Sequence, residues 1–478
     1  MNTLQNPKVK IISQKENYAN NFGEVLRSSG IFYFKQSTHF KTTISFLNYW
    51  LVRQNISITV IANVRSLSGE LLKRERLDFL VGNVINYSPF INDEFEGTVE
   101  IEIFSLTNLR IPYAALMAVY ESKQSISMVH GYARIYSQHE IEEGRTITNG
   151  NEACIPLTKN GITEVILHNG TEIQEKQKIN IRINFDNHEE IEKSLDLKKL
   201  DKFETVKINV SELVNQNIKE WRVAECYISF DLKNAFTRVL CVNRNSQYTD
   251  FQVTHSDFNY SKHKTDKIKN NWAAVSIPIN IPGKPSLLTW GANEKDKLII
   301  KKEGSKYNYD GENLILLKAK PGDLFEYKSV DKEEIPSRIH NAIVVNIDSN
   351  VLPAICNLGV YHDQRPPKKM WWAIIGYGTE YSTGISLCAL RNIYGDTKDV
   401  TANIRLYSEI SKEFLSTDIS IESLLTSKLI SIESLFPKYK SFLGNNFGYI
   451  TLYSEYGGLV LFTYICHKSG SLTIEHGF

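Results

Sequence analysis

Four histidines recur at similar intervals along the chain, each after a short apolar run. They are His130, His255, His362 and His476, separated by 125, 107 and 114 residues. If such positions meet in space, the imidazoles would bind a metal ion or hydrogen-bond a polar ligand. Alternatively, each imidazole satisfies backbone groups at its own strand end and recurs because a domain recurs. We favour this second interpretation, because a lone histidine rarely acts as a ligand without a carboxylate or second imidazole beside it.

The segment around His362 contains further candidates for ligand binding. His362 is followed by Asp363 and Arg365, and then by the adjacent Trp371 and Trp372. Two indoles beside cationic groups would form a stacking platform for a sugar ring or an acidic saccharide. The structural alternative is that the two indoles point to opposite faces of a strand, so that one lies in a core and a neighbouring domain covers the other.

A basic run between residues 260 and 269 is the third candidate, as a contact for phosphate groups. The whole chain has 55 Lys and Arg against 54 Asp and Glu, a net charge of +1, so no global field favours a polyanion. The run contains a single aromatic residue, Tyr260. We therefore interpret it as a solvated linker and expect no nucleic-acid partner.

Motifs of the common enzyme classes are absent from the sequence. It has no GxSxG, no P-loop, no GxGxxG that opens a helix and no HExxH. The carboxylates Glu100 and Glu102 could pair for glycoside chemistry, but carboxylates at alternate strand positions normally line a solvent face. The sequence therefore assigns no catalytic residue and leaves enzymatic activity open, with a non-catalytic role favoured.

The sequence also favours a soluble, cytoplasmic protein. Its first forty residues have no pattern of a secretory leader, and no run of eighteen apolar residues occurs, so we expect no transmembrane segment. The cysteines are scattered without a CxxC pair and are interpreted as reduced, buried thiols. They are Cys154, Cys226, Cys241, Cys356, Cys388 and Cys466.

Alternation of apolar and polar residues predicts an all-β fold. It is clearest in residues 56–61, 98–104, 178–184 and 449–453, where one face would be buried and the other solvated, as in antiparallel sheets. Turn pairs such as Asn169-Gly170 separate these runs. Helical periodicity is confined to residues 189–200 and 421–435, and both segments could equally be loops.

Four segments share the order of their apolar runs, and each ends near one of the four histidines. We therefore predict tandem antiparallel β-sandwich domains in a pseudo-symmetric arrangement, with polar or charged linkers between them. The predicted divisions are residues 1–40 as an N-terminal extension and residues 41–145, 146–268, 269–369 and 370–478 as the four repeats.

The ends of these units resemble the sensory rhodopsin transducer family. The resemblance rests on a unit of about one hundred residues that ends in a strand, a histidine and an arginine, as in residues 129–134 (VHGYAR) and 361–365 (YHDQR). The last copy lacks the arginine, and this chain fuses four units. The resemblance implies small β-sandwiches assembled around a shared axis, here as a covalent pseudo-tetramer, which act by binding and not by catalysis.

These observations together predict a non-catalytic recognition or scaffold protein. Its ligand would be a polar, carbohydrate-like small molecule or a protein partner, bound without a cofactor or a metal by loops at the sandwich ends. Two alternatives stay open. One is a glycan-active enzyme with a site between domains, and the other is a structural or assembly protein. Formation of a homo-oligomer is also left open.

Overall fold

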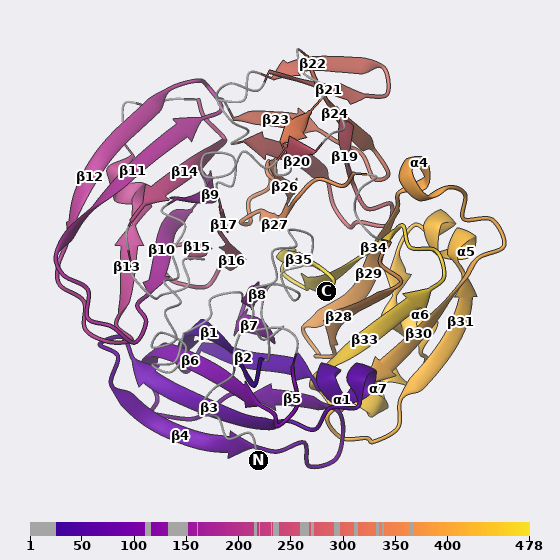
Figure 1. Ribbon diagram of the computed structural model, residues 1–478, viewed down its shortest axis with the longest axis horizontal. Coiled ribbons are helices and arrows are strands. Elements are labelled where there is room, and N and C mark those ends of the chain that lie inside the picture. Colours follow the sequence, from indigo (N-terminus) through magenta and orange to yellow (C-terminus); the bar gives the residue numbers. More distant parts are fainter. Residues whose placement is uncertain are drawn as a thin grey trace.

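A computed structural model shows a protein built almost entirely from β-strands (Figure 1). It describes residues 25–109, 116–131, 152–159, 161–214, 218, 220–230, 232, 239–258, 267–268, 272–290, 297–309, 314–330, 334–336, 339–362 and 367–478. The predicted all-β fold class with tandem sandwich-like units is confirmed.

Four consecutive modules repeat one connectivity. When the eight principal strands of a module are numbered in chain order, one sheet has the order 1-6-3-4 and the other has the order 5-2-7-8. We call these the outer and the inner sheet. Because the same strand order occurs four times, the repetition inferred from the sequence is a property of the fold.

Modules 1 and 2 occupy the first half of the chain. The outer sheet of module 1 contains β1 (Arg27–Gln36), β6 (Phe95–Phe104), β3 (Thr59–Ser66) and β4 (Leu71–Leu77), and its inner sheet contains β5 (Val84–Tyr87), β2 (Phe40–Leu47), β7 (Leu116–Ser122) and β8 (Ile126–Gly131). The outer sheet of module 2 contains β12 (Glu190–Leu197), β11 (Gln177–Phe185), β14 (Val223–Ser229), β9 (Glu152–Thr158) and β17 (Asp257–Phe258), and its inner sheet contains β13 (Thr205–Asn209), β10 (Ile162–His168), β15 (Leu240–Arg244) and β16 (Phe251–His255).

Modules 3 and 4 follow in the same pattern. The outer sheet of module 3 contains β19 (Trp272–Ser276), β24 (Leu324–Ser329), β21 (Leu298–Lys302) and β22 (Ser305–Tyr309), and its inner sheet contains β23 (Ile315–Lys318), β20 (Pro285–Trp290), β26 (His340–Val345) and β27 (Ala354–Leu358). In module 4 the outer sheet contains β28 (Met370–Gly376), β33 (Phe447–Ser454), β30 (Thr401–Tyr407) and β31 (Leu415–Ser420), and the inner sheet contains β32 (Ile430–Ser431), β29 (Tyr381–Ala389), β34 (Leu459–His467) and β35 (Leu472–His476).

The remaining elements are short. Strands β18 (Lys267–Ile268) and β25 (Ile335–Pro336) pair with each other. The helical segments are α1 (Tyr49–Gln54), η2 (Val210–Leu213), α4 (Arg391–Tyr394), α5 (Ile421–Thr426), α6 (Ile432–Leu435) and α7 (Tyr439–Leu443). In the described part of the chain, no helix has the length and apolarity needed to cross a membrane.

Several strands of the outer sheets follow the alternating pattern, whereas strands covered on both faces do not. In β11 the side chains of Ile179, Ile181 and Ile183 enter the core of module 2, while polar residues between them face outward. In β8 every residue is buried, because both faces of this strand are covered by protein. Strands covered on both faces lose the alternation that makes a strand easy to recognise in a sequence.

The modules form a closed ring (Figure 1). One apolar cluster joins Met117 of the module 1 inner sheet to Ile374 and Tyr449 of the module 4 outer sheet. A second cluster joins Tyr227 of the module 2 outer sheet to Leu288 of the module 3 inner sheet. Because module 1 contacts the last module as well as the second, the chain closes on itself.

The eighth strand of each module lies at the centre of the ring, where Figure 1 places β8, β16, β27 and β35 around one axis. The hydroxyl of Ser125 donates to the carbonyl oxygen of Phe251, and the hydroxyl of Ser127 accepts from the amide of Val253. Strands β8 and β16 therefore run in the same direction. Hydroxyl side chains explain how such buried edge strands satisfy their backbone groups without a shared ladder.

Two sequence predictions about elements are wrong. Residues 1–40 were predicted to form an extension, yet β1 (Arg27–Gln36) pairs along its whole length with β6 of module 1. Its Ile31-Phe32-Tyr33-Phe34 run is apolar without alternation because both of its faces are buried. The segment from 189 to 200 is mostly strand β12 and not a helix.

Candidate metal centre

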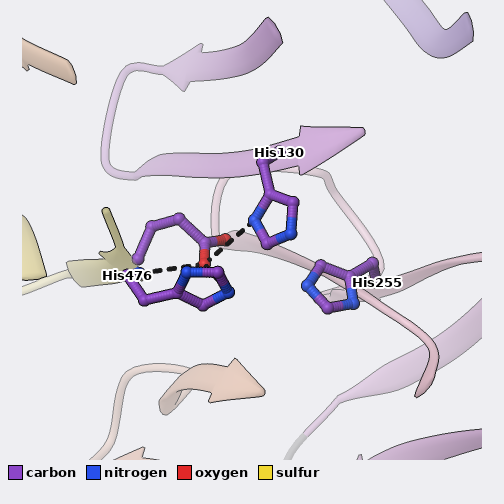
Figure 2. Close-up of side chains that lie close together, drawn as sticks. His130, His255 and His476 are labelled. Carbon is purple, nitrogen blue, oxygen red and sulfur yellow. Dashed lines mark hydrogen bonds and ion pairs between the residues drawn. The ribbon is translucent and has the colours of Figure 1, made fainter. Parts of the chain in front are cut away.

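Three of the four histidines singled out in the sequence converge on the axis of the ring. His130, His255 and His476 come from the ends of β8, β16 and β35, so three modules supply one imidazole each (Figure 2). The ring of His130 lies 4.3 Å from that of His255 and 4.7 Å from that of His476, measured between centroids. Glu475 completes the group, in which one potential ligand atom per residue lies within 4.8 Å of every other.

His362 does not belong to this group, and its assignment as the fourth equivalent histidine is wrong. The neighbouring Tyr361 forms an isolated bridge with Ala274 of module 3, outside the eighth strand. The cross-strand register instead identifies Asn357 as the residue of module 3 at the histidine position. Between the seventh and eighth strands the equivalent pairs are Met117 with His130, Leu240 with His255, Ala342 with Asn357 and Phe462 with His476.

The module that each of these residues faces supports this equivalence. Met117 packs against module 4, Leu240 packs in the cluster of module 1, and Ala342 packs against module 2. Each of these residues therefore faces the preceding module in the ring, and so does the residue opposite it in the eighth strand. A one-residue change in register would turn Asn357 to the other face.

Backbone carbonyl groups fix the orientation of two of the imidazoles. Nδ1 of His255 lies 2.8 Å from the carbonyl oxygen of Ser256, and Nδ1 of His476 lies 3.0 Å from that of Gly477. A ring nitrogen beside a carbonyl oxygen must carry the proton, so the other nitrogen, Nε2, carries the lone pair. This is the usual outer-shell arrangement of histidines that bind metals through Nε2.

A carboxylate takes the same place beside the third imidazole. Nδ1 of His130 lies 3.1 Å from Oε1 of Glu475, and the backbone amide of His476 donates to the same oxygen at 3.0 Å. Both His130 and Glu475 are buried. Glu475 is therefore the carboxylate neighbour of His130 at ion-pair distance, the kind of partner that accompanies metal-binding histidines. It could not be recognised from the sequence because its partner belongs to a different module.

The thiol of Cys356 lies close to this carboxylate, with Sγ 3.8 Å from Oε1 of Glu475. Burial raises the pKa of this thiol well above its usual value, and the charge of Glu475 raises it further. Cys356 lies outside the group of potential ligand atoms formed by the three histidines and Glu475.

Imidazole nitrogens determine which metals suit such a centre. They are good ligands for Zn²⁺, Cu²⁺, Ni²⁺ and Fe²⁺, whereas Mg²⁺ and Ca²⁺ prefer oxygen. Zinc binds imidazole at about 2.0–2.1 Å with tetrahedral geometry, so the ligand atoms around one ion lie roughly 3.4 Å apart. The potential ligand atoms here lie within 4.8 Å of one another, so the rings would have to move closer together to hold one ion.

The predicted indole platform is wrong, because Trp371 and Trp372 are each only 7% exposed. Trp371 belongs to the apolar core formed by modules 3 and 4. Trp372 faces module 1, where it stacks on Tyr49 with the ring centroids 4.4 Å apart. This is the structural alternative considered for the pair. Asp363 and Arg365 lie outside the described residues, as does most of the basic run at 260–269.

The carboxylates Glu100 and Glu102 are buried and do not line a solvent face. Arg27 contacts Oε1 of each, at 3.0 Å and 2.9 Å respectively. Asn63 donates to Oε2 of each, at 3.2 Å and 2.8 Å. With all four oxygens occupied, this pair forms a structural ion-pair network and offers no free acid or base for glycoside chemistry.

Two further carboxylates meet where modules 1 and 2 touch. Nζ of Lys207 lies 2.6 Å from Glu96 and 3.9 Å from Glu164, and Arg244 also pairs with Glu164. Burial raises the pKa of both carboxyls, but the hydrogen bonds from Lys207 and Arg244 outweigh it and leave both pKa values lowered. Since neither group stays protonated near neutral pH, this pair lacks the general acid of a glycosidase.

Comparisons with known proteins add little to this geometry. No family model matches the chain, and no curated protein matches it. Among solved structures, a tetra-tandem repeat from the extending region of a large adhesion protein aligns with 88% of this chain and 91% of its own at 7% identity. The TM-score is 0.12, which is too low to support an argument about fold or function.

Proposed function

We propose that the protein is a non-catalytic, ring-shaped binding protein that holds one divalent transition-metal ion on its axis. Nε2 of His130, His255 and His476 would ligate the ion, and Glu475 would orient His130. The observation that carries the proposal is that all three imidazoles have an oxygen atom beside Nδ1 and that, with Glu475, they offer ligand atoms within 4.8 Å of one another. The four modules act as the scaffold that brings these side chains together.

The burial of three adjacent imidazoles favours a bound metal ion over imidazole rings that pack together without one. If all three were protonated, three positive charges would share a region in which His130 and His255 are almost fully buried. One divalent ion would take the place of those protons. Its ligands would be the Nε2 lone pairs, because Nδ1 of each ring carries the proton. Imidazole ligands favour zinc or a neighbouring first-row metal over magnesium or calcium.

Metal binding would also stabilise the closed ring, because the three ligands come from modules 1, 2 and 4. A ligand that binds the folded state alone raises the free energy of unfolding by about 2.7 kcal/mol at one hundred times its Kd. A scaffold or recognition role towards a polar ligand or a protein partner is compatible with this site and remains a prediction from the sequence.

The test is a zinc titration of protein freed of metal by a chelator, followed by calorimetry and by elemental analysis after desalting. We expect one zinc ion per chain. His476→Gln should weaken binding by more than about 100-fold, because loss of an outer-shell partner alone costs 10–100-fold. His362→Gln is the matched control and should bind as the unmodified protein does. Zinc binding of equal strength in all three proteins would refute the proposal.

A further inference from the structure

The module 3 side of this centre differs from the other three. The residue at the histidine position there is Asn357, whose amide nitrogen donates to the backbone carbonyl oxygen of His255. Asn357 is 2% exposed. Among the described residues, Oδ1 of Asn357 accepts no hydrogen bond. Such a buried acceptor next to a polar cluster calls for a ligand that brings a donor.

We propose that a fourth coordination position, beside Asn357, is not filled by the protein and takes a small exchangeable ligand. This inference rests on the proposed metal site. A water molecule there would donate a proton to Oδ1 of Asn357 and would exchange with small monodentate anions. The class of ligand follows from the burial of Asn357 and from its acceptor oxygen: a small ligand with one donor atom for the ion.

Ligand chemistry favours an open position over a closed one. A neutral side-chain amide is a weak ligand for first-row metals compared with imidazole. Glu475 is the fourth member of the group of potential ligands, and its Oε1 lies beside Nδ1 of His130 and accepts from the amide of His476. The proposal assigns Glu475 to the orientation of His130 and not to the ion. The protein would then supply three imidazoles, as in zinc sites that keep an open position, whereas structural zinc sites are closed by four protein ligands.

His476 is more exposed than His130 and Glu475. The side chain of His476 is 24% exposed, whereas those of His130 and Glu475 are 0% and 4% exposed. Exchange would therefore proceed past His476. The ring of Phe478 lies 4.9 Å from that of His130, and His130, His255 and Glu475 are all buried. This burial favours a small ligand.

Cobalt(II) in place of zinc gives a direct readout, because its visible absorption depends on the number and geometry of its ligands. We would load the full-length protein with Co²⁺ and then titrate it with azide. The bands of the loaded protein should shift along a saturable, single-site curve. In Asn357→His a fourth imidazole should fill the position, tighten Co²⁺ binding by at least tenfold and abolish the response to azide.

Asn357→Ala is the companion variant, because it removes the amide but keeps the position open. It should bind Co²⁺ and still respond to azide, even if Asn357→His fails to fold. Failure of the unmodified protein to show Co²⁺ bands would refute the metal site itself. Bands that do not change with azide would refute the open position but leave the metal site standing. A full azide response in folded Asn357→His would refute the assignment of the position to Asn357.

Discussion

The carboxyl of Glu225 offers a quantitative test of how the modules are packed. It is fully buried in β14 of the module 2 outer sheet, beside Tyr227, which packs on module 3. Asn184 donates to it at 2.7 Å. Burial raises the pKa of Glu225 from 4.5 to about 8, despite the opposing hydrogen bond from Asn184 and the charge of Arg182.

The sign of the pH dependence follows from these values. Below about pH 4.5 the carboxyl is protonated in both the folded and the unfolded chain. Between pH 4.5 and pH 8 the folded protein keeps a proton that the unfolded chain releases, so its contribution to stability is lost as the pH rises. At 1.36 kcal/mol per pH unit, the loss at pH 7 is about 3 kcal/mol.

Glutamine at this position has no proton to lose and retains an oxygen that accepts from Asn184. Glu225→Gln should therefore gain stability relative to the unmodified protein as the pH rises, by about 3 kcal/mol between pH 4.5 and pH 7. Urea unfolding at several pH values measures this, because the other groups titrate equally in both proteins. Parallel stability profiles for the two proteins would refute the reasoning.

Two further substitutions test the ring and one of its interfaces. Trp372→Ala should cost about 3–5 kcal/mol, because it removes a buried indole that stacks on Tyr49 and joins module 4 to module 1; thermal unfolding measures this, and an unchanged midpoint would contradict it. Glu96→Gln should destabilise the protein at pH 7, because the lowered pKa of Glu96 reflects its bond to Lys207. The difference from the unmodified protein should shrink as the pH falls below 4.5 through that lowered pKa, and a difference that persists in acid would exclude the ion pair as its cause.

The sequence pattern could predict the β class and the repetition, because most outer strands have one buried and one solvated face. Strand β11, with Ile179, Ile181 and Ile183 on its core face, is an example. Strand β1 was not recognised, since both of its faces are covered and Phe32, Tyr33 and Phe34 follow one another without alternation. For Trp371 and Trp372 the sequence left a surface platform and a covered pair open, because a local pattern does not show that another module covers the second face.

The site could be predicted only in part. The histidines at the ends of β8, β16 and β35 were recognisable because a short strand precedes each one. The roles of Asn357 and Glu475 depend on strand register and on contacts between modules. A local sequence pattern reveals neither. The sequence pattern favours His362 over Asn357 because a histidine is expected in every repeat. The third repeat has an asparagine at this position instead.

Anomalous X-ray scattering tests the central claim most directly. Crystals of the full chain grown with zinc should give, above the zinc absorption edge, one strong anomalous peak on the axis, about 2.0–2.1 Å from Nε2 of His130, His255 and His476. The peak should vanish below the edge. Zinc bound only elsewhere, with the three imidazoles still in mutual contact and no peak between them, would contradict the account.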